Sequence, residues 1–139
     1  MSEEKAQQLM QHMQMLENYF ADLSQREVTL YGILREAKSA IESIKSLGQK
    51  PNSEALVPVG LGTFVKTKIS SNDKFVLNIG AGISLEKDSM STINYLESRI
   101  KEIEVAIQDT SAKKHDAEAR LEQGKQQINQ LLQEESQKN

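Results

Sequence analysis

The stretch from Ala55 to Lys87 constrains the fold most, because it lacks the helical periodicity found on both sides of it. Apolar and polar residues alternate there in short runs rich in β-branched and aromatic side chains, which is typical of half-buried strands. Glycines at 60, 62, 80 and 82 mark chain reversals that need positive φ or close backbone approach. The polar run 70–73 predicts a further turn. The pattern predicts two consecutive hairpins. Their strands are expected at about 56–59, 63–69, 74–79 and 83–87.

Two short hairpins leave open strand edges, and a lone hairpin is only marginally stable in water. Nothing else in the sequence offers strands to cover these edges. We therefore expect other chains to complete an intersubunit sheet or barrel. The apolar strand residues expected at this oligomer interface are Leu56, Val57, Val59, Phe64, Val65, Ile69, Phe75, Leu77, Ile79, Ile83 and Leu85. The alternative is an independent β cap on a helical hairpin, which would have a very small core.

The segments on either side space their apolar residues alternately by three and four, as coiled coils do. The predicted seam of the first helix is Leu9, Met13, Leu16, Phe20, Leu23, Leu30, Leu34, Ala37, Ile41 and Ile44, with Glu27 as a break. That of the second helix is Ile93, Leu96, Ile100, Ile103, Ile107, Thr110, Lys114, Ala117, Leu121, Gly124, Ile128 and Leu131. Thr110, Lys114 and Gly124 weaken the second seam, and we expect more fraying there than near the strands.

The helix limits follow from local signals. The first helix is expected to end near Leu47–Gly48, because glycine favours a helix end and Pro51 cannot continue one. Asp88 or Ser89 can cap the start of the second helix. These limits predict an α+β fold made of a coiled-coil helix (1–48), two hairpins (49–88) and a second coiled-coil helix (89–139), forming one structural unit. Antiparallel pairing would bring Leu9 near Ile128.

Such pairing also places the two ends of the chain together, at a tip rich in apolar residues. The candidate tip residues for binding other proteins are Leu9, Met10, Met13, Met15, Leu16, Ile128, Leu131 and Leu132. Methionine is flexible and polarisable, which suits a surface that adapts to many partners. The alternative is the frayed end of a coiled coil, with the off-seam residues half covered by the partner helix.

Composition excludes several classes of function. The chain has 139 residues, a net charge of −3 and no polybasic block, so nucleic acid is not an expected partner. It has no cysteine, which excludes disulfides and thiolate sites. The polar start MSEEKAQQ and the absence of a long apolar run argue against a signal region and a membrane span, and a cytoplasmic protein is expected.

The sequence contains no constellation that predicts catalysis, a cofactor or a metal. His12 and His115 lie off the seams among polar residues, without a partner at ligand or triad spacing, so we interpret them as surface histidines. The Gly-Leu-Gly and Gly-Ala-Gly segments do not form a phosphate-binding loop, because each lies between two strands. We therefore expect no enzyme.

The layout of coiled-coil helix, two hairpins and coiled-coil helix resembles the α-type subunits of the prefoldin family. The specific signals are LVPVGLGTFVKTKI at 56–69 and NIGAGISLEK at 78–87, in this order and at this spacing. The resemblance covers essentially the whole chain. Two hairpins favour the α type over the β type. The family has no fixed sequence at its tips, so the tip residues named above rest on geometry and not on a motif.

The resemblance implies an ATP-independent co-chaperone. In that family two α-type and four β-type chains join their hairpins in a β-barrel platform, and the coiled-coil tips hold non-native protein for transfer to a group II chaperonin. This favours the functional interpretation of the tip. An alternative from another class is a coiled-coil scaffold or filament-forming homo-oligomer that binds one defined partner. A nucleotide-using enzyme is a more distant alternative.

Overall fold

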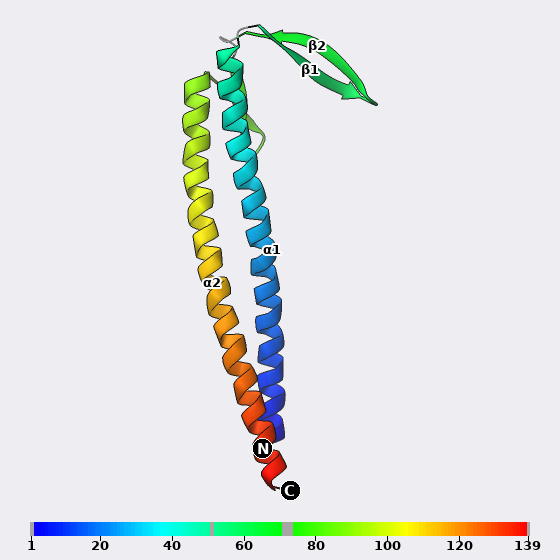
Figure 1. The fold of residues 1–139 in the computed structure, drawn as a ribbon, viewed down its shortest axis with the longest axis vertical. Helices are drawn as coiled ribbons and strands as arrows, with labels where there is room; N and C mark the ends of the chain where they lie inside the picture. The colour runs from blue at the N-terminus through cyan, green and yellow to red at the C-terminus, as the bar shows by residue number, and fades with distance from the viewer. Residues whose placement is uncertain (1, 51, 71–73, 139) are drawn as a thin grey trace. The chain divides into compact units, whose positions relative to one another are not determined.

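The computed structural model describes residues 2–50, 52–70 and 74–138. The predicted turn residues 71–73 and the predicted helix breaker Pro51 lie outside this range. The chain order is α1 (Ser2–Gln49), β1 (Ser53–Gly60), β2 (Thr63–Ile69), β3 (Phe75–Gly80), β4 (Ile83–Lys87) and α2 (Ser89–Lys138) (Figure 1). Two long helices with two antiparallel hairpins between them confirm the predicted fold class.

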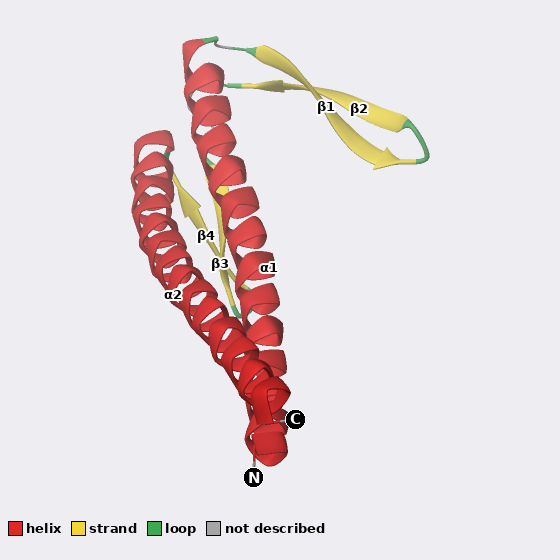
Figure 2. Cartoon of the chain, turned by 60° about the horizontal axis from the view of Figure 1, so that its bottom comes forward, coloured by secondary structure: helices red, strands yellow, loops and turns green. Residues whose placement is uncertain are grey.

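The chain divides into two compact units, to which both helices contribute. The terminal unit comprises Met1–Gly32 and Glu104–Asn139, and the central unit comprises Ile33–Ile103. Within each unit the α1 segment lies beside the α2 segment, and the two run in opposite directions (Figures 1 and 2). The central unit also carries both hairpins.

The core of each unit is the seam between the helices. Every predicted seam residue is buried or half-buried. The most deeply buried are Met13, Leu16, Leu23, Ile107, Thr110 and Ala117 in the terminal unit, and Ile41, Ile44 and Ile103 in the central unit. The spacing of three and four residues therefore marks the contact face of both helices correctly, as the coiled-coil pattern requires.

Gly124 has a packing role that its sequence position does not reveal. A Cβ atom at this seam position would overlap the sulfur of Met13. The methionine side chain on α1 thus fills the space that the missing side chain leaves on α2. This contact also shows which levels of the two seams meet, because it places Met13 of α1 beside Gly124 of α2.

Asp88 caps α2, which begins at the predicted position. Its Oδ1 accepts a hydrogen bond from the backbone N–H of Ser91 at 2.8 Å. Its carbonyl oxygen accepts hydrogen bonds from the N–H and the hydroxyl of Thr92, at 3.0 and 2.7 Å. The hydrogen bonds from Ser91, first from its backbone and then from its side chain, lower the pKa of the Asp88 carboxyl.

Both hairpins turn through two residues that have positive φ. Leu61 and Gly62 have φ of 47° and 75°, and Ala81 and Gly82 have φ of 53° and 75°. Positive φ at both central positions is the feature of the type I′ turn, which matches the twist of the adjoining strands. The predicted positive φ of the four glycines is confirmed. β1 starts earlier than predicted, because Ser53 and Glu54 continue the ladder opposite Ile69 and Lys68.

Candidate functional site: exposed strands and the coiled-coil tip

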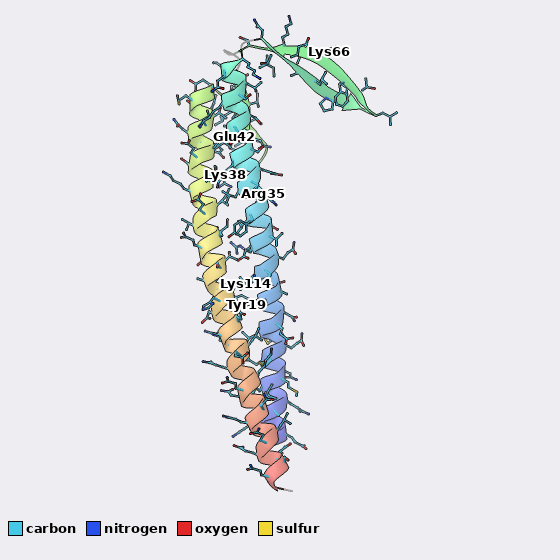
Figure 3. The ribbon with its side chains drawn as sticks, in the orientation of Figure 1. Tyr19, Arg35, Lys38, Glu42, Lys66 and Lys114 are labelled. Atoms are coloured by element: carbon cyan, nitrogen blue, oxygen red, sulfur yellow. The ribbon has the colours of Figure 1, made fainter. Side chains whose placement is uncertain are left out.

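The first hairpin has one uncharged face. Cross-strand neighbours share a face, so the pairs Ala55–Thr67 and Val57–Val65 lie together on it. The opposite face carries Glu54 and two lysines of β2, of which Lys66 is labelled in Figure 3, together with the predicted interface residues Leu56 and Phe64. A strand pair with one uncharged face and one charged face is typical of a sheet that is covered on one side only.

The second hairpin has one face on which apolar side chains predominate. Leu77 pairs with Leu85 on one face, and Val76 pairs with Glu86 on the other. In the central unit Leu77 and Ile79 line a cavity of about 550 Å³ together with Ile33, Ala37 and other residues of the two helices. The helices thus leave space beneath the apolar side of β3, and this side is only partly covered.

The predicted strand residues remain accessible in the single chain. Ile69, Phe75 and Leu77 are half-buried. The exposed members are Leu56, Val57, Val59, Phe64, Val65, Ile79, Ile83 and Leu85. Val57 and Val65 are cross-strand neighbours on the uncharged face of the first hairpin, and exposed apolar surface of this kind marks an interaction site in a soluble protein.

Leu61 extends this apolar surface and was missed by the sequence analysis. It is fully exposed at the end of the first hairpin, although its φ is positive. Alternation cannot assign a role to a turn residue, because the turn belongs to neither strand face. The signal available in the sequence was an apolar side chain between two turn glycines.

The eight predicted tip residues fall into two sets in the terminal unit. Five belong to the seam: Met13 and Leu16 are buried, and Leu9, Ile128 and Leu131 are half-buried. The other three are off the seam and accessible: Met10 is 53% exposed, Met15 is 70% exposed and Leu132 is 52% exposed. The seam set holds the helices together, and the accessible set is free to contact another protein.

A groove opens between the helices at this tip. It has a volume of about 320 Å³ and is lined by Leu9 and Leu131, with Lys5 and Glu134 among its polar neighbours. Leu9 and Leu131 were predicted, whereas the polar lining residues were missed because nothing in their spacing sets them apart. A groove with apolar lining residues and charged neighbours can accept an apolar side chain of another protein. The backbone of that protein would stay near the charged residues and water.

The described residues offer little else for chemistry. His12 and His115 are both exposed. No group of three or more histidine, aspartate or glutamate side chains among residues 2–50, 52–70 and 74–138 is placed to hold a metal ion. In the same part of the chain, neither helix is long and apolar enough to cross a membrane.

Comparisons with known proteins agree with this architecture. The sequence model described as "Prefoldin subunit" matches residues 9–139. A prefoldin subunit alpha of Nitrosopumilus maritimus is 70% identical over 133 residues, covering 96% of this chain and 92% of the relative. That of Methanospirillum hungatei is 31% identical over 122 residues, covering 83% of this chain and 79% of the relative.

A solved structure supports the fold. The filamentous PFD from Methanocaldococcus jannaschii, solved by cryo-EM, has a TM-score of 0.53 and 23% identity. The match covers 87% of this chain and 95% of that chain. Two long helices, two hairpins between them and the match over residues 9–139 lead to one conclusion: the chain belongs to the prefoldin subunit family, a family of chaperones and not of enzymes.

Proposed function

We propose that this chain is an ATP-independent co-chaperone subunit that captures non-native proteins at its coiled-coil tip and delivers them to a group II chaperonin in the cytoplasm. The observation that carries the proposal is the tip, where the Leu9–Leu131 groove lies with Met10, Met15 and Leu132 accessible to solvent. Non-native proteins differ from native ones in exposing apolar side chains, and this surface is suited to cover such side chains.

The proposal includes assembly through the hairpins. Each hairpin is a separate two-stranded sheet with exposed apolar side chains, and such sheets gain stability by adding strands. The proposed assembly is a heterohexamer of two α-type and four β-type chains whose strands close an intersubunit barrel. The relatives named subunit alpha support the α-type assignment.

Several tips acting together would hold a client without a tight single contact. Covering apolar surface contributes about 25 cal/mol per Å², so one exposed leucine or methionine adds a modest amount. Contacts from several chains of one assembly raise the overall affinity by avidity, while each contact still dissociates quickly. Rapid dissociation of single contacts permits transfer to a chaperonin.

The test compares accessible apolar residues at the tip with others elsewhere on the helices. Met10→Gln with Leu132→Gln removes two tip side chains, and Val28→Gln with Val105→Gln removes two that are more accessible but lie outside the predicted tip. Each variant is co-expressed with a β-type prefoldin chain, and the native mass is checked by light scattering. The tip variant is expected to suppress aggregation of an unfolded protein at least about threefold less well, and the control is expected to match the parent protein.

Equal loss of activity in both variants would contradict capture at the tip. Delivery is tested separately, by the yield of refolded client after addition of a group II chaperonin and ATP. A large assembly formed by this chain alone, unchanged by the β-type chain, would favour the scaffold interpretation instead.

A further inference from the structure

Two charged residues face each other inside the seam of the terminal unit. Lys114 Nζ lies 3.4 Å from Glu27 Oε1, and the two side chains are 29% and 24% exposed. Lys114 Nζ also lies 5.4 Å from the centre of the Phe20 ring, which attracts the cation. Figure 3 shows Lys114 on α2 with its side chain beside α1.

These contacts differ from the other ion pairs along α2. Arg99–Glu102, Lys113–Asp109 and Arg120–Asp116 each connect residues one turn apart on the same helix, with side chains at least half exposed. Pairs of that kind do not depend on how the two helices are aligned. The pair between Glu27 and Lys114 depends on this alignment, because Glu27 is on α1 and Lys114 is on α2.

Sequence spacing places this pair at one level of the seam only. Counting two heptads forward from Met13 along α1 and two heptads back from Gly124 along α2 places Glu27 level with Thr110. Lys114 lies one helical turn after Thr110 on α2. The Thr110 hydroxyl donates a hydrogen bond to the Ala106 carbonyl at 2.8 Å, so it is satisfied within α2. The carboxylate and the ammonium are therefore left to interact with each other.

We propose that Phe20, Glu27 and Lys114 form a register lock, which prevents the two helices of the terminal unit from sliding by one heptad in the direction that separates Glu27 from Lys114. The rest of this seam consists mainly of apolar layers, which pack nearly as well after a shift of one heptad. Such a shift would place Lys114 level with Leu16 and Glu27 within about one turn of Ile107, so that eleven residues of α1 separate the two charges. Each charge would then lie against apolar side chains without its counterion, which is costly.

The alignment matters for the tip. In the observed register Leu9 and Leu131 line the same groove. A one-heptad shift in the direction that separates the charges would bring Leu9 level with Leu121 and would place Leu131 beyond Ser2, where α1 begins. The register lock thus determines which residues meet at the tip, although it contacts none of them. The inference concerns alignment and holds whether or not the tip captures clients.

The experiment uses the absence of cysteine from the full chain. Met13→Cys with Gly124→Cys reports the observed register, and Met13→Cys with Ala117→Cys reports the register shifted by one heptad in the direction that separates Glu27 from Lys114. Each reporter pair is placed in the parent chain and in three variants. Glu27→Leu with Lys114→Leu removes the lock, Glu27→Lys with Lys114→Glu reverses it, and Asp109→Leu with Lys113→Leu removes an exposed pair as a control. Oxidation at low protein concentration is followed on unreduced gels, counting only species of monomer mass.

The leucine variant is expected to increase the shifted cross-link relative to the observed one by about tenfold, with an unfolding midpoint no lower than that of the parent. Charge reversal is expected to keep this ratio within about threefold of the parent value, since the attraction between the charges is restored. The control is expected to leave the ratio unchanged. The proposal is overturned if the folded leucine variant keeps the parent ratio, if the control changes it equally, or if the leucine variant loses its helix content.

Discussion

Asp88 lies between β4 and α2, and its carboxylate caps α2. The contribution of this carboxylate to the stability of the fold depends on pH. Its pKa is lower in the folded chain because the N–H of Ser91 donates a hydrogen bond to the ionised form. A group whose pKa is lowered by folding stabilises the fold above its unfolded pKa, and this contribution disappears as pH falls through the folded pKa. The ionised Asp88 cap is therefore fully effective near neutral pH and is lost below about pH 4.

Asp88→Asn tests this cap, because asparagine keeps an acceptor oxygen but does not titrate. The variant is expected to unfold at a lower temperature than the parent at pH 7, and the difference is expected to shrink as the pH falls below about 4. The measurement is the thermal midpoint, followed by circular dichroism across this pH range. A difference that is constant with pH would show that the charge of Asp88 is irrelevant to the cap.

Two glycines inside the helices offer a matched comparison. Replacing a helical glycine with alanine stabilises the helix by about 1 kcal/mol when the new methyl group meets nothing. Gly32→Ala meets this condition, because no other heavy atom lies within 4 Å of the added Cβ. Gly124→Ala does not, because the sulfur of Met13 occupies the space.

Gly32→Ala is therefore expected to raise the free energy of unfolding by about 1 kcal/mol, and Gly124→Ala by clearly less. Gly124→Ala is also expected to speed oxidation of Met13 by peroxide, because the displaced thioether becomes accessible. Urea unfolding and mass spectrometry of the oxidised peptides measure the two effects. Equal stabilisation by both substitutions, with Met13 still protected, would contradict the packing described above.

At the scale of elements, the sequence predicts the helices and hairpins well because their signals are local. Spacings of three and four identify the seams, and Gly60, Gly62, Gly80 and Gly82 identify the turns. The pairing of Glu27 with Lys114 was not predicted, because each residue by itself is a weak position in its own seam. The limits of β1 were also missed, since a backbone ladder continues through polar residues such as Ser53 and Glu54. The groove at the tip was predicted in part: antiparallel pairing of the seams puts Leu9 and Leu131 at one tip, but seam spacing does not identify Lys5 and Glu134 beside them.

The two faces of the first hairpin lead to an element-scale prediction. Val65 belongs to the uncharged face and Lys66 to the charged one. Val65→Lys is expected to weaken assembly with a β-type prefoldin chain by at least about tenfold, because a charge would be buried without a partner. Lys66→Gln on the opposite face is expected to leave assembly intact. Light scattering over a range of concentrations measures the mass, and equal effects of the two substitutions would refute this assignment of the faces.

At the scale of the whole molecule, the two units differ in the quality of their seams. Aliphatic residues dominate the seam of the central unit, whereas the terminal unit includes Glu27, Thr110, Lys114 and Gly124. Buried apolar contacts are the main source of local stability in a paired helix, so protection is expected to decline from the central to the terminal unit. Amide hydrogen exchange of the assembled protein, resolved by peptide, measures this gradient. Uniform protection along α1 and α2 would exclude it.

The antiparallel pairing of α1 with α2 has a consequence for synthesis on the ribosome. The partner of Met13 is Gly124, near the opposite end of the sequence. At translation rates of about 5–20 residues per second, α1 waits on the order of ten seconds before this part of α2 emerges. Leu16, Leu23 and Ile41, which are buried in the finished chain, remain open to solvent meanwhile. For that interval the nascent chain exposes the kind of apolar surface that the finished tip is proposed to hold.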